Sequence, residues 1–200
     1  LVCHSFGGVT ATALADAMPE RLALLVYVTA VIPGGGLSLN QANNDGELSR
    51  FEKALIPHEH GVSHVIDAGE AVHFFYHDCA SAVADHAVAQ LCPQTLRPLR
   101  EKAVRLDHGG ISHVPKAYIR CLDDRVLSLE VQDHCASQFD GIRRYDMPTG
   151  HSPFLADEAG FVDMLLKIER DMTTASPGDR RSNTVARRDD PDRAPRRFPE

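Results

Sequence analysis

The chain begins with Leu1-Val2-Cys3-His4-Ser5-Phe6-Gly7-Gly8, a short apolar stretch that runs into a glycine-containing turn. After the turn, apolar residues recur with the period of a helix until Pro19 ends the pattern. The next segment, Leu22 to Ile32, is an apolar run of the kind found in strands that are buried on both faces of a parallel sheet. The beginning of the chain therefore predicts a strand, a sharp turn, a helix and a second strand.

The same alternation returns after a long insertion. Residues 37–114 are polar and rich in histidine, with short helical patterns at Glu47–Leu55 and Ala82–Leu91. Beyond them the pattern predicts strand, helix, strand and helix at Lys116–Leu122, around Leu129–Phe139, at Ile142–Met147 and along an apolar stripe from Phe154 to Ile168. This order predicts a doubly wound α/β fold, with the insertion as a lid over the carboxyl ends of the strands.

The end of the chain has a different composition. From Met172 onward the apolar pattern stops, and residues 172–200 contain 7 Arg and 5 acidic residues. Such a segment buries too little apolar surface to offset the entropy of ordering it. We therefore expect one domain over residues 1–171 and a disordered tail over 172–200.

Composition and charge exclude several classes of protein. A net charge of −7 argues against a nucleic-acid binder, which needs a basic face, and the longest apolar run is too short to cross a membrane. The five cysteines, at positions 3, 79, 92, 121 and 135, are odd in number and form no Cys-x-x-Cys pair. This favours small buried side chains in a reducing, cytoplasmic protein over a disulfide framework or a zinc site.

The turn at Ser5 is suited to nucleophilic catalysis. A serine hydroxyl becomes an effective nucleophile when a base, itself oriented by a carboxylate, lies within hydrogen-bond reach. The stretch Cys3-His4-Ser5-Phe6-Gly7 nearly matches the G-x-S-x-G elbow, with the small residue Cys3 in place of the first glycine. A glycine-rich turn that merely opens a helix is the alternative.

The partners of such a serine follow in the order Asp, then His, each after a predicted strand. With Tyr27–Ala30, Tyr118–Arg125, Thr149–Phe154 and the insertion's Phe74–Cys79, the chain resembles the esterase and hydroxynitrile-lyase branch of the α/β-hydrolase fold over about residues 1–171. The resemblance implies the C-terminal part of a mostly parallel sheet with flanking helices and a helical cap at about 37–114.

The resemblance also implies roles for individual residues. Ser5 is expected to be the nucleophile, His151 the general base and Asp124 the orienting acid, with the N–H of Phe6 as an oxyanion donor. Asp123 competes with Asp124, but the family pattern places the acid directly before the arginine that follows. We expect His4 to play a supporting role.

The early strands of the family, and the loop that supplies a second oxyanion donor, have no counterpart in the sequence. We therefore expect the chain by itself to be a poor catalyst with an exposed sheet edge. The histidines of the insertion, including His58, His60 and His64, resemble a metal site only superficially and are expected to be solvated. Neither a metal nor a cofactor is implied.

The function expected from this resemblance is hydrolysis of a small, largely apolar carboxylic ester through an acyl-enzyme. A hydroxynitrile lyase is an alternative, although Ser152 occupies the position where those lyases carry lysine. A cofactor-free perhydrolase or dioxygenase and a ligand-binding pseudo-hydrolase are further alternatives on the same fold.

Overall fold

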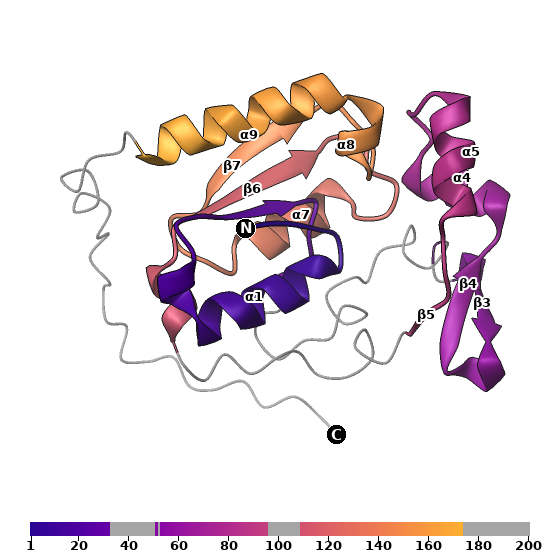
Figure 1. Cartoon of the computed structure of the whole chain (residues 1–200), viewed down its shortest axis with the longest axis horizontal. Helices are drawn as coiled ribbons and strands as arrows, with labels where there is room; N and C mark the ends of the chain where they lie inside the picture. Colours follow the sequence, from indigo (N-terminus) through magenta and orange to yellow (C-terminus); the bar gives the residue numbers. More distant parts are fainter. Residues whose placement is uncertain (33–50, 52, 96–108, 174–200) are drawn as a thin grey trace, which may run out of the picture.

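The computed structural model describes residues 1–32, 51, 53–95 and 109–173. Their centre is a four-stranded parallel sheet with the strand order β1-β2-β6-β7 (Figure 1). The strands are β1 (Val2–His4), β2 (Leu25–Val28), β6 (Lys116–Cys121) and β7 (Arg143–Met147). Each neighbouring pair is parallel, which confirms the predicted α/β arrangement.

Helices cover both faces of this sheet, with α1 and α7 on one side and α9 on the other (Figure 1). These elements are α1 (Gly7–Ala17), α7 (Leu129–Ala136) and α9 (Glu158–Thr173), joined by the short helices η1 (Pro19–Arg21), η3 (Gly110–His113) and α8 (Pro153–Ala156). The side chains of β2 are apolar on both faces of the sheet, so each face must be packed against helices. Leu25 and Tyr27 join the core with α1 and α7, whereas Val26 and Val28 pack with Ile168 of α9.

The residues from Leu55 to Thr95, within the predicted insertion, form a separate layer beside the sheet and are called the cap below (Figure 1). Its helices are α4 (Ala68–Phe75), which Asp67 caps by accepting hydrogen bonds from two backbone N–H groups, and α5 (Ser81–Ala89). It also contains a three-stranded antiparallel sheet of β3 (Leu55–His58), β4 (Ser63–Ile66) and β5 (Gln94–Thr95), with η2 (Glu59–Gly61) at the β3–β4 turn. Helix α5 corresponds to the helical pattern predicted at Ala82–Leu91, whereas α4 and the strands of the cap were not among the predicted elements.

Several predicted boundaries differ from the structure. The second strand is shorter than Leu22–Ile32, because Thr29 takes a positive φ of 35° and turns the chain out of the sheet after Val28. Leu55, expected at the end of a helix, begins β3. The stripe from Phe154 to Ile168 is divided between α8 and α9, and its members Val162 and Leu166 are exposed.

Helix α9 continues to Thr173, two residues into the predicted tail. The remaining tail, residues 174–200, lies outside the described residues, as do residues 33–50 and 96–108 of the predicted insertion. Within the described ranges, every helix is too short or too polar to span a lipid bilayer.

Candidate active site

Ser5 lies in the sharp turn between β1 and α1, where it takes a positive φ of 51°. A non-glycine residue adopts this conformation only where the surrounding structure holds it. The Ser5 carbonyl accepts hydrogen bonds from the N–H groups of Gly8 at 3.1 Å and Val31 at 3.0 Å. A Cβ added to Gly8 would lie 2.3 Å from the carbonyl oxygen of Val31, whereas one on Gly7 would meet nothing within 4 Å. Gly8 therefore allows α1 to start close to the segment that follows β2, and Ser5 is held above the sheet.

Asp124 lies in the loop after β6, and its carboxylate is fully enclosed. One oxygen accepts hydrogen bonds from the backbone N–H groups of Val126 at 2.6 Å and Leu127 at 3.0 Å, and the other accepts one from the Thr29 hydroxyl at 2.5 Å. Burial opposes the charged form of Asp124, but His151 and these hydrogen bonds outweigh it and hold the pKa of the carboxyl below its ordinary value. Asp124 is thus ionised and fixed in orientation.

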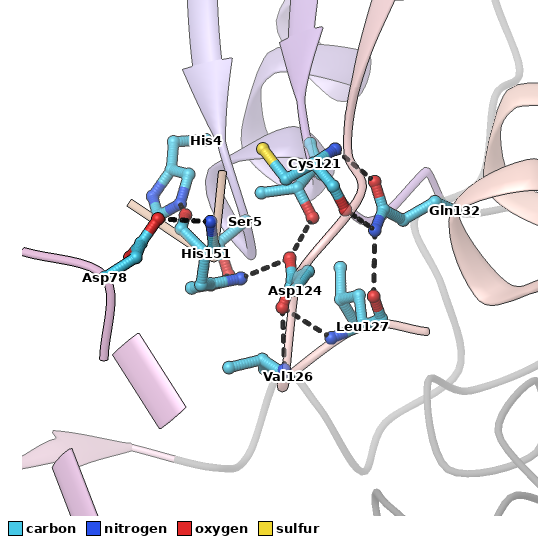
Figure 2. A network of polar contacts seen from close by, with 12 residues as sticks. His4, Ser5, Asp78, Cys121, Asp124, Val126, Leu127, Gln132 and His151 are labelled. Atoms are coloured by element: carbon cyan, nitrogen blue, oxygen red, sulfur yellow. Dashed lines mark hydrogen bonds and ion pairs between the residues drawn. The ribbon is translucent and has the colours of Figure 1, made fainter. Parts of the chain in front are cut away.

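The buried side chain of Gln132 on α7 holds the two ends of the Asp124 loop. Its amide oxygen accepts from the N–H of Cys121, and its amide nitrogen donates to the carbonyls of Cys121 and Leu127, each at 2.9 Å (Figure 2). The loop therefore keeps its shape without regular secondary structure.

His151 lies after β7, and its ring joins the other two side chains. Nδ1 is 2.8 Å from the Asp124 carboxylate, and Nε2 is 2.9 Å from the Ser5 hydroxyl. Figure 2 shows the ring between the acid and the turn that carries Ser5. An imidazole that donates from Nδ1 to a carboxylate has a free lone pair on Nε2, which can accept the serine proton.

His4 contacts both the backbone and the ring of His151. Its Nε2–H donates to the backbone carbonyl of His151 at 2.6 Å, and its ring contacts those of His151 and Phe154, with centroids 4.7 and 5.0 Å apart. Burial, with a smaller contribution from His151, lowers the pKa of His4 to about 4, although the hydrogen bond to His151 and the charge of Asp124 act in the opposite direction. His4 is therefore neutral at physiological pH.

The structure brings together the three side chains singled out from the sequence, Ser5, Asp124 and His151. Asp123, the competing acid, is exposed and contributes its backbone N–H to the carbonyl of Thr149. The N–H of Phe6 follows Ser5 at the start of α1, and in the described part of the chain it has no hydrogen-bond partner. It is free to donate to an oxyanion, and this role stays a prediction.

Sequence reasoning missed three residues that shape the site: Thr29, Gln132 and the cap residue Asp78. Thr29 is completely buried, and its place inside the apolar run Leu22–Ile32 is the one sequence signal that could have indicated a buried hydroxyl with a polar partner. Gln132 and Asp78 are polar residues in ordinary helical and loop patterns. Their contacts connect residues far apart in sequence, so local patterns did not reveal them.

Ser5 and His151 border a cavity of about 620 Å³ between the sheet and the cap. Its lining is mostly apolar and includes Val31, Phe51, Leu55, Ile66, Phe75, Val88, Leu91, Val126, Leu127, Phe154 and Leu155. The cavity fits a small molecule whose surface is largely hydrophobic.

Some side chains of the cap differ from their expected environments. His64 also borders the cavity and is buried, whereas a solvated histidine was expected, because β4 turns its side chain inward. Cys92 is exposed and Cys79 only partly buried, in contrast to the buried Cys121 and Cys135. Among the residues that the structure describes, no group of three or more His, Cys, Asp or Glu is arranged to bind a metal.

Comparison with known proteins places this geometry in context. A family model described as "Alpha/beta hydrolase family" matches residues 1–164. The chain is similar to Methylesterase 17 of Arabidopsis thaliana, at 26% identity over 180 residues, which is 84% of this chain and 64% of that protein. It is also 26% identical over 194 residues to the Pyrethroid hydrolase of Sphingobium wenxiniae, covering 88% of this chain and 68% of that protein.

Solved structures share the fold. A pyrethroid hydrolase from Sphingobium faniae JZ-2 superposes with a TM-score of 0.73 at 22% identity, over 90% of this chain and 71% of that one. For polyneuridine aldehyde esterase the TM-score is 0.65 at 19% identity, over 84% of this chain and 71% of that one. The chain thus spans about two thirds of the length of these relatives.

Proposed function

The chain belongs to the alpha/beta hydrolase family, and we propose that it is a serine hydrolase that cleaves small, largely apolar carboxylic esters through an acyl-enzyme. One observation carries the proposal. Ser5, His151 and Asp124 form a continuous chain of hydrogen bonds, 2.9 and 2.8 Å long, whose serine end borders an apolar cavity. Relatives named as a methylesterase and a pyrethroid hydrolase support hydrolytic chemistry.

The first half of the reaction forms the acyl-enzyme. Ser5 Oγ attacks the ester carbonyl while its proton passes to Nε2 of His151, and the Asp124 carboxylate stabilises the resulting imidazolium. The N–H of Phe6 donates to the carbonyl oxygen as it gains negative charge. When the tetrahedral intermediate collapses, the C–O bond to the alcohol breaks, and the alcohol leaves with the proton from Nε2.

The second half releases the acid. A water molecule gives a proton to Nε2 of His151 as its oxygen attacks the acyl carbon, and the bond to Ser5 Oγ then breaks as that proton returns to the serine. The products are a carboxylic acid, an alcohol and the restored hydroxyl. Water is the only co-reactant.

The apolar lining of the cavity supports the substrate class. Residues from both layers contribute to it, Val31 and Phe154 from the sheet side and Leu55, Ile66 and Phe75 from the cap. Esters with short hydrocarbon groups bury apolar surface there, which contributes about 25 cal/mol per Å². A charged substrate would have to give up much of its hydration in this mostly apolar lining.

The experiment uses the 200-residue chain with p-nitrophenyl butyrate and a fluorophosphonate probe that labels activated serines. We expect slow ester turnover that still exceeds the Ser5→Ala background, and labelling at Ser5. The matched control is Ser81→Ala, which alters an exposed serine at the start of α5 and should keep both signals. Saturable binding of the ester without turnover or labelling would assign the chain to the ligand-binding class instead.

A further inference from the structure

We propose that Asp78 of the cap is a positioning residue, which holds the backbone of the histidine loop so that His151 stays in line with Ser5. The histidine loop is residues 148–152, between β7 and α8. This inference rests on the proposed function, because it assigns a role in the same site. It adds that the cap holds part of the catalytic geometry as well as covering the cavity.

The contact itself is direct. The Asp78 carboxylate accepts a hydrogen bond from the backbone N–H of Gly150 at 2.5 Å, although the two residues are 72 positions apart in the chain. Figure 2 shows the Asp78 side chain reaching from the cap towards His4 and His151. A charge-assisted hydrogen bond to a backbone N–H is among the stronger polar contacts in proteins. Gly150 directly precedes His151, so this bond fixes the backbone from which the catalytic ring projects.

The cap and the histidine loop pack so closely that a larger residue at position 150 would displace side chains of the cap. A Cβ on Gly150 would lie 2.5 Å from Cε1 of His77 and 2.8 Å from a carboxylate oxygen of Asp78. Asp78 itself is held in a turn, in which the N–H of Cys79 donates to the carbonyl of Tyr76 at 3.0 Å. The Asp78 carboxylate therefore meets Gly150 where the cap and the histidine loop are closely packed.

Three consecutive residues of the loop are each anchored by a different part of the protein. The N–H of Asp123 donates to the Thr149 carbonyl at 3.0 Å, Asp78 accepts from Gly150, and His4 donates to the His151 carbonyl at 2.6 Å. The first and third anchors come from the sheet layer. In the described part of the chain, Asp78 provides the anchor from the cap.

A second cap contact reaches the histidine ring. The ring of Phe75, at the end of α4, lies 5.7 Å from that of His151 between centroids. Phe75 and Asp78 bracket a single turn after α4, so displacement of this turn removes the backbone anchor and the ring contact together. The position of the cap is thereby coupled to the alignment of His151.

The test compares Asp78→Ala and Asp78→Asn with the parent chain in p-nitrophenyl butyrate hydrolysis, below the melting temperature of every variant. We expect Asp78→Ala to lower kcat by about 10- to 100-fold, as small misplacements of catalytic groups do, with KM within about twofold. Asp78→Asn keeps an oxygen that accepts from Gly150 and should recover kcat to within about threefold of the parent. Asp85→Ala, an exposed acid on α5, is the matched control and should leave both constants unchanged.

An unchanged kcat in Asp78→Ala, or an equal loss in Asp78→Asn, would overturn the positioning role. If the parent shows neither turnover nor fluorophosphonate labelling, the proposed function fails, and the role of Asp78 is then tested separately by NMR of the His151 ring. Asp78→Ala should shift and broaden the Nδ1–H resonance of His151, and Asp78→Asn should restore it. A resonance that is the same in Asp78→Ala as in the parent would overturn the inference independently of activity.

Discussion

Neutral His4, which is partly buried, makes the stability of the fold depend on pH. Its pKa is lowered to about 4 by burial, against an ordinary value of 6.5 that it regains when the chain unfolds. The unfolded state therefore binds a proton at a higher pH than the folded state does. Above pH 6.5 the titration of His4 costs the fold no stability, and the free energy of unfolding then decreases as the pH falls towards 4.

The size of the effect follows from these two pKa values. Each pH unit between them corresponds to about 1.4 kcal/mol, so the loss reaches about 3 kcal/mol once the pH is below both. Between pH 7 and pH 5 the loss is about 2 kcal/mol. In a chain of this size, that lowers the melting temperature by about 4–8 °C.

The measurement is thermal unfolding of the parent and of His4→Gln at pH 7 and pH 5. Groups that titrate in both proteins cancel in the comparison, so the parent should lose about 2 kcal/mol more than the variant over this interval. His86→Gln, which replaces an exposed histidine on α5, should keep the pH dependence of the parent. An equal loss in the parent and in His4→Gln would refute the assignment of the effect to His4.

Three further predictions concern the acid, the elbow and the buried hydroxyl. Asp124→Asn should lower kcat by about 10⁴, as the equivalent change does in a triad protease, and Asp123→Asn by less than tenfold; the reverse order would move the acid to Asp123. Gly8→Ala should destabilise the fold by about 1–3 kcal/mol in urea unfolding through overpacking, whereas Gly7→Ala, which faces open space, should stay within about 0.5 kcal/mol of the parent. Thr29→Val removes a hydrogen bond to the Asp124 carboxylate that is worth about 1.5–3 kcal/mol, so kcat should fall at least about tenfold while circular dichroism shows the fold intact; full activity would contradict a role for Thr29 in the site.

The sequence was sufficient for the parts of the fold that depend on local patterns. Two-sided burial makes β2 apolar throughout, and the turn at Ser5 is recognisable because Cys3 and Gly7, both small, stand two residues on either side of a serine between a strand and a helix. The choice of Asp124 over Asp123 came from a family resemblance, and the structure gives its physical basis: only Asp124 is enclosed and within reach of His151.

The strands of the cap were beyond such patterns. Strand β3 contains Pro57, a residue that usually argues against a strand. It is nevertheless a strand because it pairs with the antiparallel strand β4. The hydrogen bond between Thr29 and Asp124 joins residues 95 positions apart, so its existence depends on the strand order and not on any nearby spacing. Contacts of this kind can be identified from the three-dimensional arrangement of the strands.

The contrast among the cysteines offers a practical route to observing ligands. Burial raises the pKa of Cys3 and Cys121 to about 12, so their thiols stay protonated and unreactive towards alkylating reagents at neutral pH. Cys92 is exposed and borders the cavity. A maleimide fluorophore attached to Cys92 would sit beside the cavity and report its occupancy by a change in emission, while Cys3, two residues before Ser5, remains unmodified.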